Sequence, residues 1–216
     1  PDLSSIPTDI AMTPADIAMA PADIATPPGD LAMGPLDLVN APWCKLIVNE
    51  VQVGTVQTAS EEFVEFYNPC NYDVPLAGWS MVYRSAANAN PPDATGDNTT
   101  KQFPQNAVIR GQGYYVVCTT LFTGKCDSTY GMVGIMAAAG GGVGVRDPMA
   151  VLTDSVGYGT ATNPFVEGGM GNAAPAPPVA NSPGASIGRL PNTVDTNVNK
   201  DDWKATMVIT PDSANQ

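Results

Sequence analysis

The stretch KLIVNEVQV at residues 45–53 and the stretch EEFVEFY at residues 61–67 decide the fold of this chain. Both are rich in β-branched and aromatic side chains, which favour extended strands, and Asn68-Pro69 ends the second one. Successive side chains on a strand point to opposite faces. The nearly unbroken apolar run at 63–67 therefore predicts a strand that is buried on both faces.

Short apolar runs separated by turn residues continue along the rest of the chain. No stretch shows a convincing amphipathic helix, and glycine and proline, with 21 residues each, punctuate the sequence. Many short strands separated by turns predict an all-β sandwich or barrel. The further predicted strands span 76–84, 103–109, 113–119, 132–136, 142–146 and 150–158, followed by two extended pieces at 184–190 and 203–210.

Individual residues in these strands carry specific expectations. Trp79 follows Gly78 and is expected to fill the core between the sheets. The glycines at 140–142 and 144 are expected to permit a tight turn and a close approach of strands. Glu62 and Glu65 are an odd number of residues apart, so they point to opposite faces of a regular strand. We expect a carboxylate there to accept hydrogen bonds from loop amides rather than to form an acid–base pair.

Residues 1–42 follow a different rule, because an aspartate followed by Leu or Ile recurs at every seventh position from Asp2 to Asp37. A seven-residue apolar repeat normally indicates a coiled coil. Here a proline precedes the aspartate in each unit from the second onward, and proline breaks a helix. We therefore predict an extended, Pro-rich N-terminal arm, largely polyproline-like, in front of a domain at 43–216. The arm presents one aliphatic side chain per unit: Leu3, Ile10, Ile17, Ile24, Leu31 and Leu38.

The arm has two interpretations that the residues leave open. Proline stiffness and one negative charge per heptad would suit a solvated spacer that holds the domain away from a surface. Aliphatic side chains at equal intervals would equally suit a docking strand that lies along pockets of neighbouring subunits, since extended segments commonly bind in grooves or at sheet edges.

The charge balance excludes some partners. The net charge is −12, and residues 1–43 hold six acidic and no basic residues. Nucleic acids and anionic membrane surfaces attract basic proteins, so we expect no nucleic-acid partner. No run reaches the roughly 20 apolar residues of a membrane helix, so we expect no transmembrane segment. Because the chain starts at Pro1 without Met, we expect a processed product. A removed export signal, with a lipid-bearing cysteine just upstream of Pro1, would fit this start.

The four cysteines, Cys44, Cys70, Cys118 and Cys126, form no C-x-x-C motif. An even number without metal-site spacing indicates disulfides in an oxidising compartment. Four cysteines allow three pairings. We favour Cys44–Cys70, which flank a probable strand pair, and Cys118–Cys126, which would close a short loop; free buried thiols are the alternative.

Most enzyme classes lack their residues in this sequence. Histidine is absent, which removes the commonest general base and the commonest metal ligand. The stretch GASIG at 184–188 matches the hydrolase pattern G-x-S-x-G, but a Pro-rich loop precedes it and no helix pattern follows. We expect Ser186 to lie in a late strand instead. Phosphate-binding loops and dinucleotide motifs do not occur either. The sequence predicts a protein that is not an enzyme.

Calcium is the ligand that the polar residues favour most. Residues 195–202 read DTNVNKDD, which places oxygen-bearing side chains at alternate positions as in calcium loops. Lys200 stands where such a loop has glycine and Thr206 where it has a bidentate glutamate. The alternative is therefore a turn whose Asx side chains bond the backbone. The candidate ligands are Asp195, Asn197, Asn199 and Asp201, with Asp93 and Asp97 as a weaker second candidate; no other cofactor is expected.

A family resemblance rests on stretches spread over about 45–215: IVNEV (47–51), EFVEFYNP (62–69), VPLAGW (74–79), GYYVV (113–117), GGVGVRD (141–147), DSVGYG (154–159), GASIGR (184–189), then Asp195, Asn199 and Asp202-Trp203, and TPDSAN (210–215). Together these stretches resemble the lamin tail domain in its bacterial secreted form. The resemblance implies an immunoglobulin-like β-sandwich after the arm and no shared enzymatic activity. In nuclear lamins the domain is a binding module, and in bacteria it occurs on exported or surface proteins. This chain lacks the coiled-coil rod of lamins, so their filament mechanism does not carry over.

Two functional hypotheses follow for an extracellular or bacterial cell-surface protein. In the first, the chain is a non-enzymatic structural subunit that assembles into a filament, sheath or envelope layer through residues 1–42. Its partners would be copies of itself or other surface proteins. In the second, it is a cell-surface module that binds a glycan or a protein, with calcium assisting, and the arm is a spacer.

Overall fold

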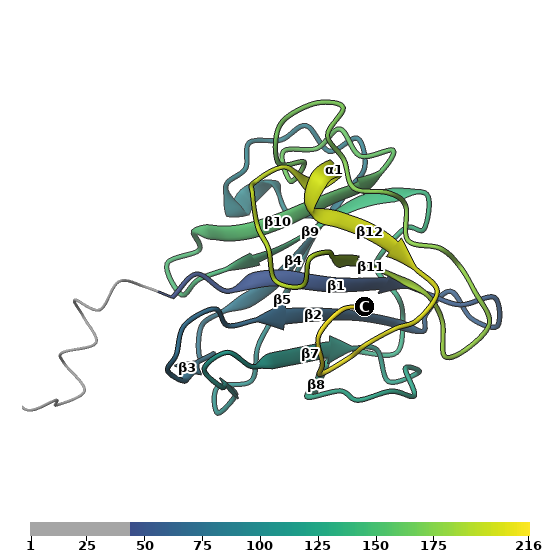
Figure 1. Ribbon diagram of the computed structural model, residues 1–216. Helices are drawn as coiled ribbons and strands as arrows, with labels where there is room; N and C mark the ends of the chain where they lie inside the picture. Colours follow the sequence, from purple (N-terminus) through teal and green to yellow (C-terminus); the bar gives the residue numbers. More distant parts are fainter. Residues whose placement is uncertain (1–43) are drawn as a thin grey trace, which may run out of the picture. The chain divides into compact units, whose positions relative to one another are not determined.

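The computed structural model describes residues 44–216, which form a sandwich of β-sheets (Figure 1). The predicted arm at residues 1–42 and its aliphatic side chains lie outside the described residues. A 3-10 turn, η4 (Ala94–Gly96), and a short helix, α1 (Asn199–Asp202), accompany the strands. The strands are β1 (Ile47–Val53), β2 (Glu62–Tyr67), β3 (Val74–Pro75), β4 (Ser80–Ser85), β5 (Thr99–Gln102), β6 (Val108–Ile109), β7 (Tyr114–Cys118), β8 (Ser128–Thr129), β9 (Gly140–Arg146), β10 (Leu152–Gly159), β11 (Ser186–Arg189) and β12 (Trp203–Thr206).

Two sheets make the layers of the sandwich. One has six strands in the order β12-β11-β1-β2-β7-β8, and the other has four in the order β10-β9-β4-β5. Strands β3 and β6 pair with each other. Neighbouring strands run antiparallel, apart from the parallel pair β7 and β8. The prediction of an all-β sandwich is confirmed for the described residues.

The core lies between the two sheets, because every second residue of a strand faces inward. Trp79 is only 2% exposed and belongs to the core, as predicted. Burial of each large apolar side chain stabilises the fold by about 1.5–3 kcal/mol. The strand residues of this cluster include Val48, Val51, Val53, Val64, Phe66, Met81, Tyr83, Val143, Val145, Val156, Tyr158, Ile187 and Trp203.

Strand β2 is buried on both faces, as its apolar run predicts. Val64 and Phe66 face the main core. Phe63 points to the other face, where it packs in a second apolar cluster with Phe122; their ring centres are 4.8 Å apart. A strand covered on both sides is the natural centre of the fold, and β2 lies between β1 and β7.

Two disulfides crosslink the described residues, and their pairing is the one that the sequence favours. Cys44–Cys70 joins the start of the described chain to the loop after β2. Cys118–Cys126 closes the loop between β7 and β8. Two disulfides are typical of a non-cytoplasmic, oxidising compartment. Among residues 44–216, no helix has the length and apolarity of a membrane span.

Some strand predictions were wrong. Residues 132–136 form a loop, because the backbone amides of Ile135 and Met136 donate to the Glu62 carboxylate and not to a neighbouring strand. Of 103–109, only Val108–Ile109 is a strand. The polar run Thr99–Gln102, which the apolar pattern passes over, pairs with β4 as the edge strand β5. An edge strand needs less apolar sequence because one side stays in solvent.

The glycines of β9 allow close packing within a strand. We expected a tight turn at 140–142 and 144, but all of these residues lie in β9. The expected close approach is present: a Cβ atom on Gly141 would lie 2.7 Å from the Tyr83 ring, and one on Gly142 would lie 2.9 Å from the Phe165 side chain. Glycine at these positions makes room for aromatic side chains.

Candidate functional site

An arginine at the end of β11 is the centre of a buried ion-pair network. The Arg189 side chain is fully buried, and its Nη2 donates to both carboxylate oxygens of Asp154, at 3.0 and 2.9 Å. Its Nη1 lies 3.2 Å from Asp195 and 3.3 Å from Asp202. The guanidinium carbon is 5.1 Å from the centre of the Trp203 ring. A guanidinium suits this place because it binds carboxylates bidentately and stacks on aromatic rings.

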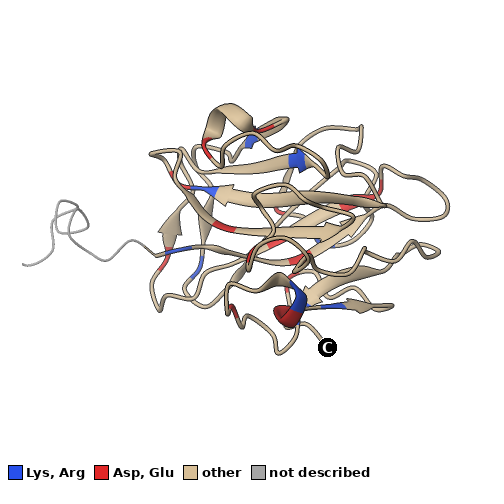
Figure 2. Cartoon of the chain, turned by 90° about the horizontal axis from the view of Figure 1, so that it is seen from above, with Lys and Arg blue, Asp and Glu red and all other residues tan. Residues whose placement is uncertain are grey.

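This network ties the two sheets together. Asp154 lies on β10 in the four-stranded sheet, and Arg189 lies on β11 in the six-stranded sheet. Asp154 Oδ2 also accepts a hydrogen bond from the Val48 N–H of β1 at 2.6 Å. Arg189 Nε donates to the Val48 carbonyl oxygen at 2.8 Å. The ion pair between Arg189 and Asp154 therefore connects the two sheets. Figure 2 shows that charged residues lie on strands as well as in loops.

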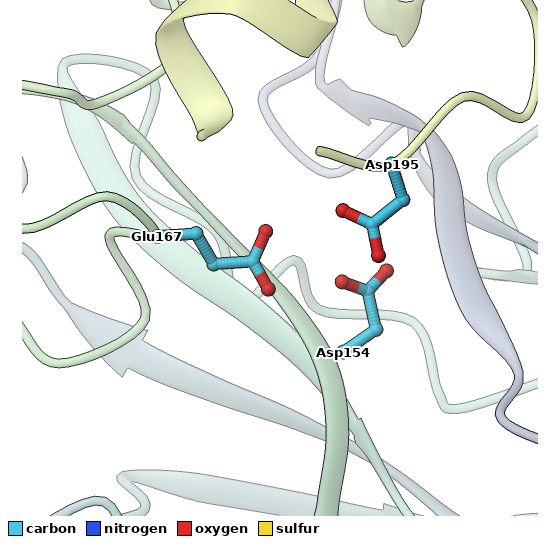
Figure 3. A group of neighbouring side chains, drawn as sticks. All are labelled: Asp154, Glu167 and Asp195. Atoms are coloured by element: carbon cyan, nitrogen blue, oxygen red, sulfur yellow. The ribbon is translucent and has the colours of Figure 1, made fainter. Parts of the chain in front are cut away.

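Three carboxylates lie together beside Arg189 (Figure 3). Asp154, Glu167 and Asp195 each have an oxygen within 4.8 Å of the others. Burial, reinforced by the Asp154 charge, raises the pKa of Glu167 to about 9, so Glu167 carries a proton at neutral pH. Burial also raises the pKa of Asp154, although the Arg189 charge opposes the shift.

Among the described residues, this group brings three carboxylates close enough together to offer oxygen ligands to a hard cation such as calcium. A positive charge is already there. Arg189 Nη2 is 2.9 Å from Asp154 and 4.0 Å from Glu167. A divalent ion would meet the guanidinium and would have to displace the proton of Glu167.

Of the four predicted calcium ligands, the structure places only Asp195 in this carboxylate group. Asn197 and Asp201 are exposed, whereas Asn199 is buried. Asn199 begins α1, and residues two apart on a helix point in different directions. Asn199 and Asp201 of this pattern therefore point in different directions, and Asp195 and Asn197 precede the helix.

Asn199 acts instead as a bridge between backbone segments. Its Oδ1 accepts the N–H groups of Gly157 and Glu167, both at 2.9 Å. Its Nδ2 donates to the Ser155 carbonyl oxygen at 3.1 Å and to Glu167 Oε2 at 2.8 Å. All of its side-chain donors and acceptors are engaged within the protein.

Calcium is expected to change the stability of the protein little. Because Arg189 and the proton on Glu167 already offset part of the negative charge of the carboxylates, millimolar calcium at neutral pH should shift Tm by less than about 1 °C. Thermal melting of chelator-treated protein, with and without added calcium, measures this. A rise of several degrees that the Asp195→Asn variant removes would contradict the expectation.

Glu62, buried in β2, holds a loop by its backbone. Its carboxylate accepts the Tyr130 hydroxyl at 2.6 Å and the N–H groups of Ile135 and Met136 at 2.8 and 2.9 Å. Glu65 points to the other face and accepts the Asp212 N–H at 2.6 Å. The prediction that carboxylates here satisfy loop amides is confirmed, for both residues.

Glu50 of β1 lies opposite Glu65 of β2 in the sheet register. Like Glu65, it binds the C-terminal tail (residues 207–216). Its carboxylate accepts the N–H and the hydroxyl of Thr210, at 3.1 and 3.0 Å. It also accepts the Ser186 hydroxyl at 2.5 Å. Ser186 is fully buried in β11, the late strand that we expected for it.

The folded protein is expected to be more stable near pH 5 than near pH 9. Burial, with the Glu50 charge adding to it, raises the pKa of Glu65 to about 8 from an ordinary value of 4.5. A raised carboxyl pKa stabilises the fold fully below the ordinary value, and this contribution is lost as the pH rises through the folded-state value. Glu167 acts in the same direction.

Urea unfolding at several pH values measures this dependence, with a slope of up to about 1.4 kcal/mol per pH unit for each group. The Glu65→Gln variant should show a flatter profile, because glutamine keeps the shape without the titration. A stability that rises steadily from pH 5 to pH 9 would show that the buried carboxylates do not control it.

A second buried ion-pair group holds the loop at residues 86–98. Asp97 accepts Arg84 Nε at 2.9 Å and Arg146 Nε at 2.7 Å, so its carboxylate, one of the weaker calcium candidates, is already bound by two cations. Both guanidiniums also lie over Phe165, at 4.8 and 6.0 Å from its ring centre. They donate onward to carbonyl oxygens of the loop: Arg84 to Asn90, Pro91 and Asp93, and Arg146 to Pro92.

These arginine centres were not predicted from the sequence, although the sequence contains a signal for them. Arg84, Arg146 and Arg189 each close an apolar strand run, in MVYR, GVGVR and SIGR. A cation at the end of a core strand needs a buried partner, and the structure provides Asp97 and Asp154 as these partners. Comparison with protein-family models found no match, and a search of curated proteins found none either.

Proposed function

We propose that this protein is a non-enzymatic extracellular structural subunit that assembles with copies of itself, through residues 1–42, into a filament, sheath or envelope layer. One observation carries the proposal. Every buried acidic or basic side chain among the described residues makes hydrogen bonds to other groups of the protein. These hydrogen bonds hold the sheets or the loops in place. These side chains are Glu50, Glu61, Glu62, Glu65, Arg84, Arg146, Asp147, Asp154, Arg189 and Asp202.

Catalysis needs an acid, base or nucleophile that can reach a substrate. Here the Glu62 and Glu65 carboxylates are buried and accept hydrogen bonds from loop amides, and Ser186 is fully buried and donates to Glu50. Together with the disulfides, these contacts favour a body built for rigidity. The resemblance to secreted lamin tail domains supports the same role, since that family implies no shared enzymatic activity.

Deleting residues 1–42 is expected to abolish assembly while the body stays folded. The core, both disulfides and the ion-pair networks all lie within residues 44–216. Sedimentation velocity of the full chain and of the deletion variant measures assembly. Near-ultraviolet circular dichroism and a free-thiol assay check that the shortened chain is folded and oxidised. Assembly that survives the deletion would sink the proposal.

The second candidate is a surface binding module for a glycan, favoured by one polar pocket of about 490 Å³. Its lining combines an aromatic ring with charges of both signs, from Arg110, Tyr114, Lys125, Asp127 and Asp212. A few converging polar groups beside an aromatic ring are typical of a ligand site. Glycan-array binding by a protein that stays monomeric, and its loss in Arg110→Ala, would favour this function over assembly.

A further inference from the structure

An apolar groove lies at one end of the sandwich. Its volume is about 410 Å³, and its lining includes Pro183, Met207, Val208 and Ile209. The side chains of Met207 and Val208 are 66% and 60% exposed. No charged residue lines the groove. Apolar surface that stays open to solvent marks a contact site when it is concave and continuous.

Strand registers place the groove at the far end of the body from residue 44. β1 starts at Ile47, beside the Cys44–Cys70 disulfide, and ends at Val53. The loop after β1 is bound to the groove segment, because the Val56 N–H donates to the Ala180 carbonyl oxygen at 2.9 Å. In Figure 1 these loops lie at the end of the sandwich where β1 and β12 finish. Residue 44 and the groove therefore lie at opposite ends of β1.

We propose that this groove is the docking site for residues 1–42 of a second copy of the chain. The inference rests on the proposed function and names the surface that receives the arm. The chemistry matches: the arm repeats Pro, Ala and Leu or Ile with one Asp per unit, and the groove offers Pro, Ala, Val, Ile and Met side chains without a carboxylate that would repel the Asp.

Length also fits a second copy. Forty-two residues can span on the order of 140 Å when extended, and β1, with its seven residues, is about 23 Å long. One heptad in a polyproline conformation spans about 22 Å. A single heptad is thus about as long as β1, and the whole arm is long enough to reach past its own body to the groove of a second copy. A contact between two unlike surfaces, the arm and the groove, is also heterologous, and heterologous contacts generate rings or open chains.

The test uses three variants of the full chain in sedimentation velocity. The groove variant carries Met207→Glu and Val208→Glu, at positions exposed enough to leave the fold unchanged. The arm variant carries serine at Leu3, Ile10, Ile17, Ile24, Leu31 and Leu38. The matched control carries Met149→Glu and Val151→Glu, which are 63% and 55% exposed in the turn between β9 and β10. Melting curves confirm that all three are folded.

The groove variant and the arm variant should each sediment as monomers, while the control assembles like the parent chain. A mixture of the two should associate again, with an apparent Kd within about tenfold of the parent's, because intact arms meet intact grooves. Four outcomes would overturn the docking site: an assembling groove variant, a mixture that stays monomeric, a control that loses assembly, or an arm variant that still assembles.

These outcomes also separate the inference from the proposed function. If the groove variant assembles and the arm variant is monomeric, the groove is not the docking site, but assembly still depends on the arm. An arm variant that assembles while the groove variant does not indicates direct contact between two grooves. A parent chain that is monomeric at all concentrations overturns both the inference and the proposed function.

Discussion

Replacing Arg189 with alanine is expected to destabilise the body by about 3–5 kcal/mol. The guanidinium is the partner of Asp154, which is 3% exposed, and of Asp202, which is also 3% exposed. Its removal leaves buried carboxylates without a counter-charge, and it also takes away the hydrogen bond to the Val48 carbonyl oxygen. Domains of this kind are stable by about 5–15 kcal/mol in total, so the loss is a large part of the whole. Urea unfolding at neutral pH measures it.

Two further variants give that measurement its meaning. Arg110→Ala removes an exposed arginine and should unfold like the parent chain. The double variant Arg189→Met, Asp154→Leu removes both partners, and it should be more stable than Arg189→Ala because no charge is left unpaired on Asp154. If Arg189→Ala unfolds like the parent, the network does not join the sheets energetically.

Asp97→Ala is expected to have an effect of similar size, about 3–5 kcal/mol, for the opposite reason. It leaves two buried cations, Arg84 and Arg146, whose side chains are 0% and 3% exposed. Both guanidiniums also fix the loop at 86–98 through its carbonyl oxygens, so that loop should become sensitive to proteases. Urea unfolding measures the global loss, and limited proteolysis with mass spectrometry locates the cleavage.

Asp93 in the same loop provides the control. Its exposed carboxylate accepts the Thr95 N–H at 3.0 Å and contacts neither arginine side chain by hydrogen bond. Asp93→Ala should therefore have a far smaller effect on unfolding. Equal losses for Asp93→Ala and Asp97→Ala would show that the loop, and not the buried ion pair, determines the stability.

The strands could be predicted wherever the side chains follow the two-residue period of a sheet. The apolar runs of β1, β2 and β7 identify themselves because both faces or the core face are buried. β5 was not predicted because its sequence, TTKQ, has no apolar pattern. This edge strand forms by pairing with β4 and not by burial of its side chains. Residues 132–136 were wrongly predicted as a strand because their side chains are apolar. Met132 and Val133 are in fact exposed, in a loop that Glu62 holds by hydrogen bonds.

The polar sites were harder to predict because their partners are distant in sequence. Arg189 and Asp154 come into contact only when the two sheets stack. No local pattern in either strand predicts which residue of the other sheet will be the partner. Of the alternate polar residues at 195–202, Asn199 and Asp201 lie in α1, where they point in different directions, and the sequence pattern did not predict this short helix. Local motifs such as the loop-satisfying carboxylates of β2 succeeded, since a buried charge must find donors whatever the topology.

The glutamates of β1 and β2 have a consequence for how this protein can vary. Glu50, Glu62 and Glu65 hold the loop at 130–136 and the C-terminal tail mainly by main-chain N–H groups, which every residue except proline supplies. The identity of the side chains on those segments is thus largely uncoupled from the path of the backbone. Diversifying the outward-facing positions there should yield families of surfaces on one unchanged scaffold, provided that proline is kept away from the anchored amides.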